Sequence, residues 1–181
     1  MRDDRWLFAK LDEVWDKYFS DVPQENDVRI VWGRRTRNRL GSIKQVAIPN
    51  PQAPNNKHVS NLKIQKLNEN CKLKIENYVR HPETIITINS LFKDANIPEY
   101  VVIGTIAHEL AHYTHGFHSP LEQRFATPHA GGVVHQEMEN RGLGEIHRQQ
   151  KRWLKANWRN YLEQKLPRKK PRRRKVIIRW I

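Results

Sequence analysis

Two histidines and a glutamate near the middle of the chain stand at a spacing that suits a metal site. The segment His108-Glu109-Leu110-Ala111-His112 separates the two imidazoles by four residues. In a helix they would lie on one face, about 6 Å apart along the axis, where both can bind one Zn²⁺. Glu109, beside the first ligand, could accept a proton from a water that the metal activates and later pass it to a leaving amine. The motif therefore predicts zinc-dependent peptide hydrolysis with Glu109 as general base.

The residues around this motif predict a buried helix. Pro98 suits the first helical turn, and Gly116 suits the left-handed residue that follows the last turn. Between them, apolar residues occur almost all round the helix. The competing interpretation, a helix that carries surface histidines, fits such a segment poorly, because unpaired polar groups inside it would be costly. A bound metal would offset that cost.

The spacing leaves two candidates for a third protein ligand. His118 follows His112 by six residues, a recurring zinc spacing when the chain reverses just after the helix, and Gly116 could provide the reversal. His129 lies in the segment Pro128-His129-Ala130-Gly131-Gly132, at a predicted helix start. There the two glycines would let the backbone approach the metal helix closely.

Other polar side chains near the motif are less suited to bind the same metal. His115 is two turns along from His108, too far to share its metal, and it could instead favour the helix C-terminus. His135, on the following helix, is interpreted as an ordinary surface histidine. The spacing identifies no group that would stabilise a transition state: Tyr113, His115 and several arginines are all conceivable.

Hydrophobic periodicity predicts a mixed α+β chain around the motif. A β-branched run at 84–88 is typical of a buried strand. Residues 58–80 fit either a strand or a helix, residues 49–56 are a loop by composition, and 176–181 fit a short edge strand. The predicted elements are helices at 5–19, 98–115, 131–141 and 144–166 and strands at 28–32, 41–48 and 84–88.

The charge of the chain is concentrated at its C-terminal end. The 181 residues carry a formal charge of +14, and residues 148–181 hold 14 Lys and Arg against one acid. Such a localised charge suggests an anionic partner, most often DNA or RNA, and aromatic residues such as Trp153 and Trp158 could stack on unpaired nucleotides. The competing interpretation is that both tryptophans pack the last helix onto the core and that the basic segment only assists solubility.

Composition also excludes several classes of protein. With 38% hydrophobic and 29% charged residues the chain can form a core. It has no stretch of about 20 apolar residues that could span a bilayer, and its N-terminus lacks the apolar region of a secretory signal. A single cysteine, Cys71, cannot form an internal disulfide. These features lead us to expect a cytoplasmic protein without a membrane partner.

Several segments together resemble the SprT-like zinc metallopeptidases of the minigluzincin group, over roughly residues 28–143. Leu40-Gly41-Ser42 is similar to the family's Trp-Gly-Ser-Cys, with Leu40 in place of the Trp and Ile43 in place of the Cys. The segment 86–91 is similar to its strand that ends in Asn-x-x-Leu. Tyr100-Val101-Val102 leads into the metal motif as in the family. His129-Ala130-Gly131-Gly132 is similar to its His-Gly-x-x-aromatic segment, although no aromatic residue follows His129 at the expected place.

This resemblance implies a fold, a ligand set and a reaction. The fold would be α+β, with a small mixed or antiparallel sheet packed on a buried metal-binding helix and additional N- and C-terminal helices. The cleft would run between the sheet edge and that helix. His129 would complete the site with His108 and His112, whereas a related branch uses the shorter spacing that His118 satisfies. Residues 1–166 would form the metallopeptidase domain and 167–181 a basic tail.

Three functions follow from these observations. The first is a zinc-dependent endopeptidase acting on protein or peptide substrates, to which DNA or RNA could bring it; the resemblance implies this because several members of the family associate with DNA. The second is a nucleic-acid-binding protein with a structural zinc centre, which would have four protein ligands rather than three. The third is a metal-dependent ribonuclease with similar histidine spacing. That family has Gly after the first His, so Glu109 favours peptide hydrolysis.

Overall fold

The computed structural model describes residues 1–49 and 79–166. Several predicted segments lie outside the described residues. They are the loop at 49–56 except residue 49, the ambiguous segment 58–80 except residues 79 and 80, the basic tail 167–181 and the strand at 176–181. Within the described ranges the chain forms a mixed α+β fold with a three-stranded sheet. No helix there is both long enough and apolar enough to cross a membrane.

The sheet is mixed and has the strand order β1-β3-β2. Strand β1 (Val28–Trp32) pairs in parallel with β3 (Val79–Ile88), and β2 (Gly41–Pro49) pairs with β3 in the antiparallel sense. Ile86 of β3 is opposite Ile30 of β1 and Ile43 of β2, and all three side chains are buried. This row of isoleucines gives the sheet one apolar face, as expected for a half-covered sheet.

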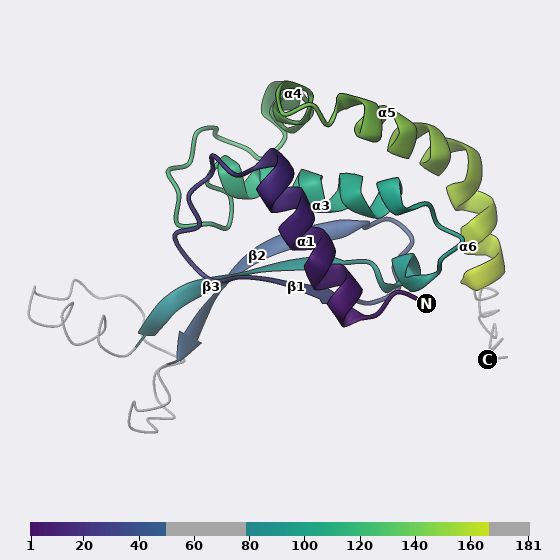
Figure 1. The fold of residues 1–181 in the computed structure, drawn as a ribbon, viewed down its shortest axis with the longest axis horizontal. Helices are drawn as coiled ribbons and strands as arrows, with labels where there is room; N and C mark the ends of the chain where they lie inside the picture. Colours follow the sequence, from purple (N-terminus) through teal and green to yellow (C-terminus); the bar gives the residue numbers. More distant parts are fainter. Residues whose placement is uncertain (50–78, 167–181) are drawn as a thin grey trace, which may run out of the picture.

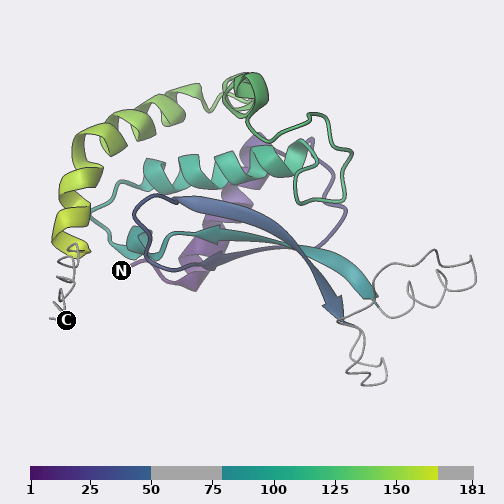
Figure 2. The same cartoon turned by 180° about the vertical axis from the view of Figure 1, so that it is seen from behind.

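Helix α3 (Glu99–Thr114) lies across this sheet and is the most buried element of the fold. Figure 1 shows the sheet on one side of α3 and helices α4 (Val133–Asn140) and α5 (Gly144–Trp153) on the other. The same layers are seen from behind in Figure 2. Being covered from both sides explains why α3 is apolar almost all round. Its ends agree with the sequence: Pro98 is the N-cap, and Gly116 has a φ of 78°.

The terminal helices complete the core. Helix α1 (Asp4–Tyr18) buries Leu7, Leu11 and Val14, and the carboxylate of Asp3 caps it by accepting a hydrogen bond of 2.8 Å from the Trp6 backbone N–H. At the other end, α5 continues through a π-helical segment (Leu154–Trp158) into α6 (Arg159–Lys165). The bend near this segment in Figure 1 is what a π-bulge in a helix produces.

The tryptophans of this last helix contact the protein interior. The rings of Trp158 and buried Phe92 meet edge to face, with their centroids 5.7 Å apart. The indole N–H of Trp158 donates to the Arg37 carbonyl at 3.0 Å. Trp153 is partly buried against the core. These contacts support the interpretation that the two rings pack the helix onto the core.

The predicted elements correspond to observed ones, with shifted boundaries. Strand β3 begins at Val79, before the β-branched run that predicted it, because it pairs along most of β2. Helix α4 begins at Val133 rather than 131, because Gly131 and Gly132 have φ of 59° and 75° and cannot continue a right-handed helix.

Asn89, directly after β3, holds the loop that joins β1 to β2. Its amide donates to the carbonyl oxygens of Thr36 and Arg39, both at 2.8 Å, and its side-chain oxygen accepts from the Leu91 backbone N–H at 3.1 Å. Asn89 is 3% exposed, so water cannot readily replace these bonds. These bonds fix the conformation of the loop, so that Leu40 and Gly41, which follow it, lie against α3.

We predict that Asn89→Ala lowers the free energy of unfolding by about 1–3 kcal/mol, because it leaves two loop carbonyls without their donor. Urea denaturation followed by circular dichroism measures the change. Asn96→Ala is the matched control, since Asn96 is exposed and donates only through its backbone in the bonds described. An equal loss in both variants would contradict the role given to Asn89.

Candidate metal centre

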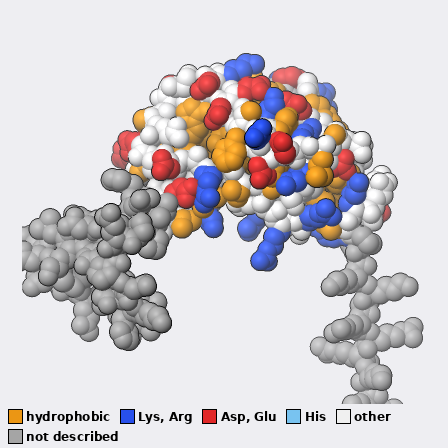
Figure 3. Space-filling view, turned by 60° about the horizontal axis from the view of Figure 1, so that its bottom comes forward, with side chains coloured by type: hydrophobic (Ala, Val, Ile, Leu, Met, Phe, Trp, Pro, Cys, Tyr) orange, Lys and Arg blue, Asp and Glu red, His pale blue; other side chains and the backbone are white. Residues whose placement is uncertain are grey.

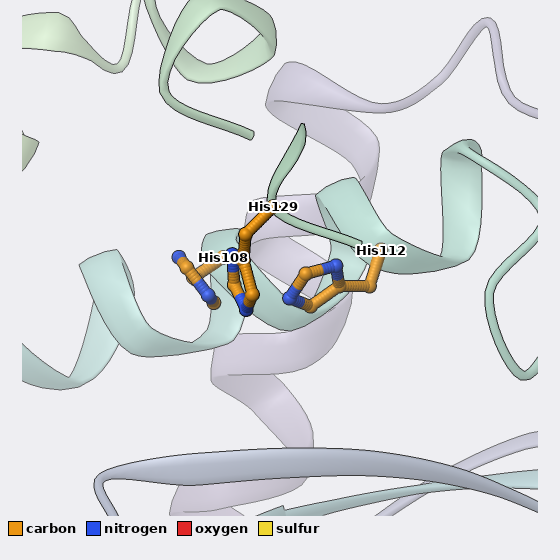
Figure 4. A group of neighbouring side chains, drawn as sticks. All are labelled: His108, His112 and His129. Atoms are coloured by element: carbon orange, nitrogen blue, oxygen red, sulfur yellow. The ribbon is translucent and has the colours of Figure 1, made fainter. Parts of the chain in front are cut away.

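Three histidines from two separate segments meet at one point. His108 and His112 lie one turn apart on α3, and His129 comes from the loop that precedes α4 (Figure 4). Each offers a ring nitrogen within 4.8 Å of those of the other two. The ring centroids are 4.8 Å apart for His108 and His112, and 4.7 Å for His112 and His129. The cluster could therefore hold one metal ion.

The protonation of the cluster suits a metal ligand set. Burial, reinforced by the neighbouring histidines, lowers the pKa of His108 to about 4 and that of His112 to about 3. Both imidazoles are thus neutral at neutral pH, the form that binds metals. Nδ1 of His112 is buried and has no hydrogen-bond partner in the described structure. Three converging imidazoles, of which His108 and His112 are neutral, and an orphaned buried nitrogen fit Zn²⁺ and other first-row divalent ions.

The loop that carries His129 owes its shape to the two glycines that follow. Gly131 and Gly132 both have positive φ, and a Cβ at either position would have no atom within 4 Å. The expectation that these glycines allow a close approach to the metal helix is therefore wrong. Their function is conformational: they let the chain turn from His129 into α4 through backbone angles that other residues rarely adopt.

Glu109 lines the same cavity as His108, in space that a glycine of β2 leaves open. Its side chain is 5% exposed and makes no hydrogen bond or ion pair with another described residue. A Cβ on Gly41 would stand 2.6 Å from Oε1 of Glu109 and 2.8 Å from Cγ2 of Thr105. Gly41, the first residue of β2, therefore leaves room for the carboxylate, which is a physical reason for glycine in the Leu40-Gly41-Ser42 segment.

Burial also controls the charge of Glu109. It raises the pKa of this carboxyl group from 4.5 to about 8, and the positive charge of Arg39 opposes the rise. A cation at the histidine cluster would lower this pKa, because a nearby positive charge favours the ionised form. With a metal bound, Glu109 would thus be available as a base.

A cavity of about 380 Å³ opens at Glu109 and His108, between α3, α5 and the start of β2. The cavity lies at the start of β2, which is an edge strand of the described sheet. The residues that line it are Asn38, Arg39, Leu40, Gly41, Thr105, His108, Glu109, His147, Gln150, Lys151 and Leu154.

The structure separates the other candidate residues from the cluster. His118 is exposed and does not belong to it, although the chain does reverse after α3. His115 is buried and its Nε2 lies 3.3 Å from a carboxylate oxygen of Glu137. The Tyr113 hydroxyl donates to the side-chain oxygen of Asn26 at 2.9 Å. Since the contacts of Tyr113 and His115 lie elsewhere, neither is placed to act on a substrate at the cluster.

Three further residues of the cavity were not identified from the sequence: Arg39, His147 and Lys151. His147 and Lys151 are on α5, 38 or more residues from Glu109 along the chain, and Arg39 is in the β1–β2 loop. No spacing rule connects them to the metal motif. The packing of α5 on α3, where the Gln150 amide donates to the Val101 carbonyl at 3.0 Å, brings His147 and Lys151 to the cavity, and the β1–β2 loop brings Arg39.

Comparisons with protein-family models, with curated proteins and with solved structures gave no match. The interpretation of the site therefore rests on the sequence motif and on the geometry described above.

We predict that Glu109→Gln stabilises the metal-free protein increasingly as the pH rises. Because the folded state raises the pKa of Glu109 from 4.5 to about 8, stability from this group is present below 4.5 and is lost as the pH rises through 8. Glutamine does not titrate. The difference in free energy of unfolding between variant and wild type, measured by urea denaturation with chelator present, should grow between about pH 5 and pH 9. A difference that stays constant would contradict the burial of an uncompensated carboxyl group.

A second prediction concerns the third ligand. His129→Ala should abolish zinc retention, because it removes one of the three converging nitrogens, whereas His118→Ala should leave retention nearly intact. Metal analysis of the purified variants after dialysis measures both. The opposite pattern would assign the third ligand to His118.

Proposed function

We propose that this chain is a zinc-dependent endopeptidase of the SprT-like kind. The observation that carries the proposal is the open histidine cluster with a buried carboxylate beside it. His112 and Glu109 are buried on α3, whereas His129 is exposed to solvent. Such a site can admit a substrate on one side and is closed by protein on the other.

The number of converging histidines favours catalysis over a structural centre. Structural zinc sites have four protein ligands, and catalytic sites have three and an open position. Among the described residues the cluster contains three histidines, and His118 is not one of them. This supports an enzyme against the alternative of a nucleic-acid-binding protein with a structural zinc.

The roles of the residues follow from their positions. His108, His112 and His129 would hold the ion. Zn²⁺ in such a site supplies a Lewis acid, which makes a water acidic enough to react near neutral pH. Glu109 would accept the proton of that water and deliver it to the amine that leaves when the peptide bond breaks.

The position of β2 supports a polypeptide substrate. Within the described sheet β2 pairs only with β3, and its first residue, Gly41, faces Glu109. An extended peptide could add to this free edge by main-chain hydrogen bonds, which would place a peptide bond near the carboxylate. The third candidate function, a ribonuclease, lacks such support.

A role for nucleic acid remains part of the proposal through the basic segment 167–181, which lies outside the described residues. On the face seen in Figure 3, Lys and Arg side chains line the lower edge of the described domain, while acidic side chains are mixed with basic ones above them. A domain of mixed surface charge is consistent with the sequence, in which most of the net charge belongs to the last 34 residues.

We predict that Glu109→Gln lowers the rate of hydrolysis of an unfolded protein by about 10²–10⁴-fold, because the general base is lost. Cleavage is measured with zinc, and again with chelator, for wild type and variant. Metal analysis must show equal zinc in both proteins, since Glu109 is not among the converging ligands.

The same proteins incubated with RNA test the ribonuclease function. Chelator-sensitive cleavage of RNA but not of protein would contradict the proposed function. Zinc retention with no cleavage of either substrate would favour the structural centre.

A further inference from the structure

The cavity beside Glu109 has a second wall that the proposed chemistry does not use. Its α5 side is formed by His147, Gln150 and Lys151, and its rim by Arg39 from the β1–β2 loop. Glu109 is the single acidic residue among those that line it. The wall opposite the carboxylate is therefore cationic or neutral.

His147 is a buried polar group without a partner. It is 8% exposed, and neither ring nitrogen makes a hydrogen bond in the described structure. The nitrogen of the nearby Gln150 amide is already used, since it donates to the Val101 carbonyl at 3.0 Å and the Thr105 hydroxyl at 2.9 Å. The Gln150 side chain also opposes the fall in the pKa of His147 that burial causes. Leaving a buried imidazole unsatisfied is unfavourable. Because even a neutral imidazole has one N–H donor, a ligand with an acceptor oxygen would satisfy His147.

Two cations near this ring also lack acidic partners. No ion pair joins Arg39 or Lys151 to a described acid. Two other basic residues of α5 do have acidic partners: Arg148 pairs with Glu139 at 3.0 Å, and Arg152 pairs with Glu145 at 3.0 Å. The solvent-facing arginines of this helix are thus neutralised, while the cation at the cavity is not.

Both free charges act inside the cavity. Arg39 and Lys151 both line it, and the charge of Lys151 adds to the effect of burial in lowering the pKa of His147. Positive charges at a recess with low-dielectric walls concentrate a field that attracts anions.

We infer that this cavity is a subsite for a carboxylate side chain, Asp or Glu, of a polypeptide substrate. Lys151 would pair with the carboxylate, the His147 ring would donate a hydrogen bond to it, and Arg39 would attract it at the rim. The inference rests on the proposed function, because the subsite adjoins Glu109 and would select an acidic residue near the bond that is cleaved.

The depth of the site favours a side chain over a nucleic-acid phosphate. The His147 ring is more than nine-tenths buried within a cavity of about 380 Å³. A carboxylate at the end of a flexible side chain can reach such a donor while its backbone stays on β2. A phosphodiester has a sugar on each side, which would have to enter with it.

Binding of two labelled peptides to the full-length, metal-free protein tests the inference. The peptides are identical apart from one central residue, Glu in one and Gln in the other. With chelator present nothing is cleaved, so fluorescence polarisation reports the subsite alone. At low salt the Glu peptide should bind about tenfold more tightly, as expected for one charge-assisted contact, and salt should reduce the difference.

Variants of the cavity residues test which side chains cause the difference in affinity between the Glu and Gln peptides. Lys151→Gln should reduce the preference to near one, and His147→Gln should reduce it several-fold. Arg152→Gln is the matched control, because it removes one charge from the same helix at a side chain that is 72% exposed and paired with Glu145. It should keep the preference. Lys151 is exposed, so its variant should fold even if the His147 variant does not.

Two results would overturn the inference: equal binding of the Glu and Gln peptides, or a preference that survives Lys151→Gln. Tighter binding of a single-stranded oligonucleotide that depends on Lys151 and His147 would assign the cavity to phosphate instead. Since all these measurements are made without metal, they are independent of the cleavage assays. Failure of the peptidase function would leave the binding result intact, and the reverse is also true.

Discussion

The site depends on the burial of polar side chains in a helix that protein covers on two sides. Packed between the sheet and α4–α5, helix α3 carries His112 at 6% and Glu109 at 5% exposure. Removal from water keeps the histidines neutral and makes an ionised Glu109 costly. A divalent ion would bind the neutral imidazoles, and its positive charge would stabilise the ionised form of Glu109. The same burial that destabilises the metal-free site thus prepares it for a metal.

Interactions distant from the histidines give this helix its surroundings. Asn89 holds the β1–β2 loop through two carbonyl groups, and the loop leads to Gly41, where the missing side chain leaves space for Glu109. On the other side Gly104 allows α5 to approach: a Cβ there would stand 2.6 Å from the Gln150 side-chain oxygen. Close contacts on both faces of α3 therefore set the width of the cavity. A change in either contact would alter the shape of the cavity without replacing any of the three histidines.

The charged side chains around the cavity come from separate elements of the fold. Glu109 and His108 line the cavity from α3, and His147 and Lys151 line it from α5. Glu139 and Glu145 pair with the exposed Arg148 and Arg152, and Glu139 also opposes the fall in the pKa of His147 that burial causes. We infer that this cavity accepts a single acidic side chain.

The sequence by itself determined the helices and strands of the described residues and the pairing of His108 with His112 on one helical face. Periodicity, caps and β-branched runs predicted the helices and strands that the described residues form, and the four-residue spacing put His108 and His112 on one helical face, because these features are local. It also offered both His118 and His129 without a geometric reason to choose. Only the tertiary structure brought His129 to α3 and turned His118 to solvent, since this depends on how a loop folds back over a helix. Likewise, Arg39, His147 and Lys151 have no sequence relation to the motif; the packing of α5 and of the β1–β2 loop against α3 decided that they share its cavity.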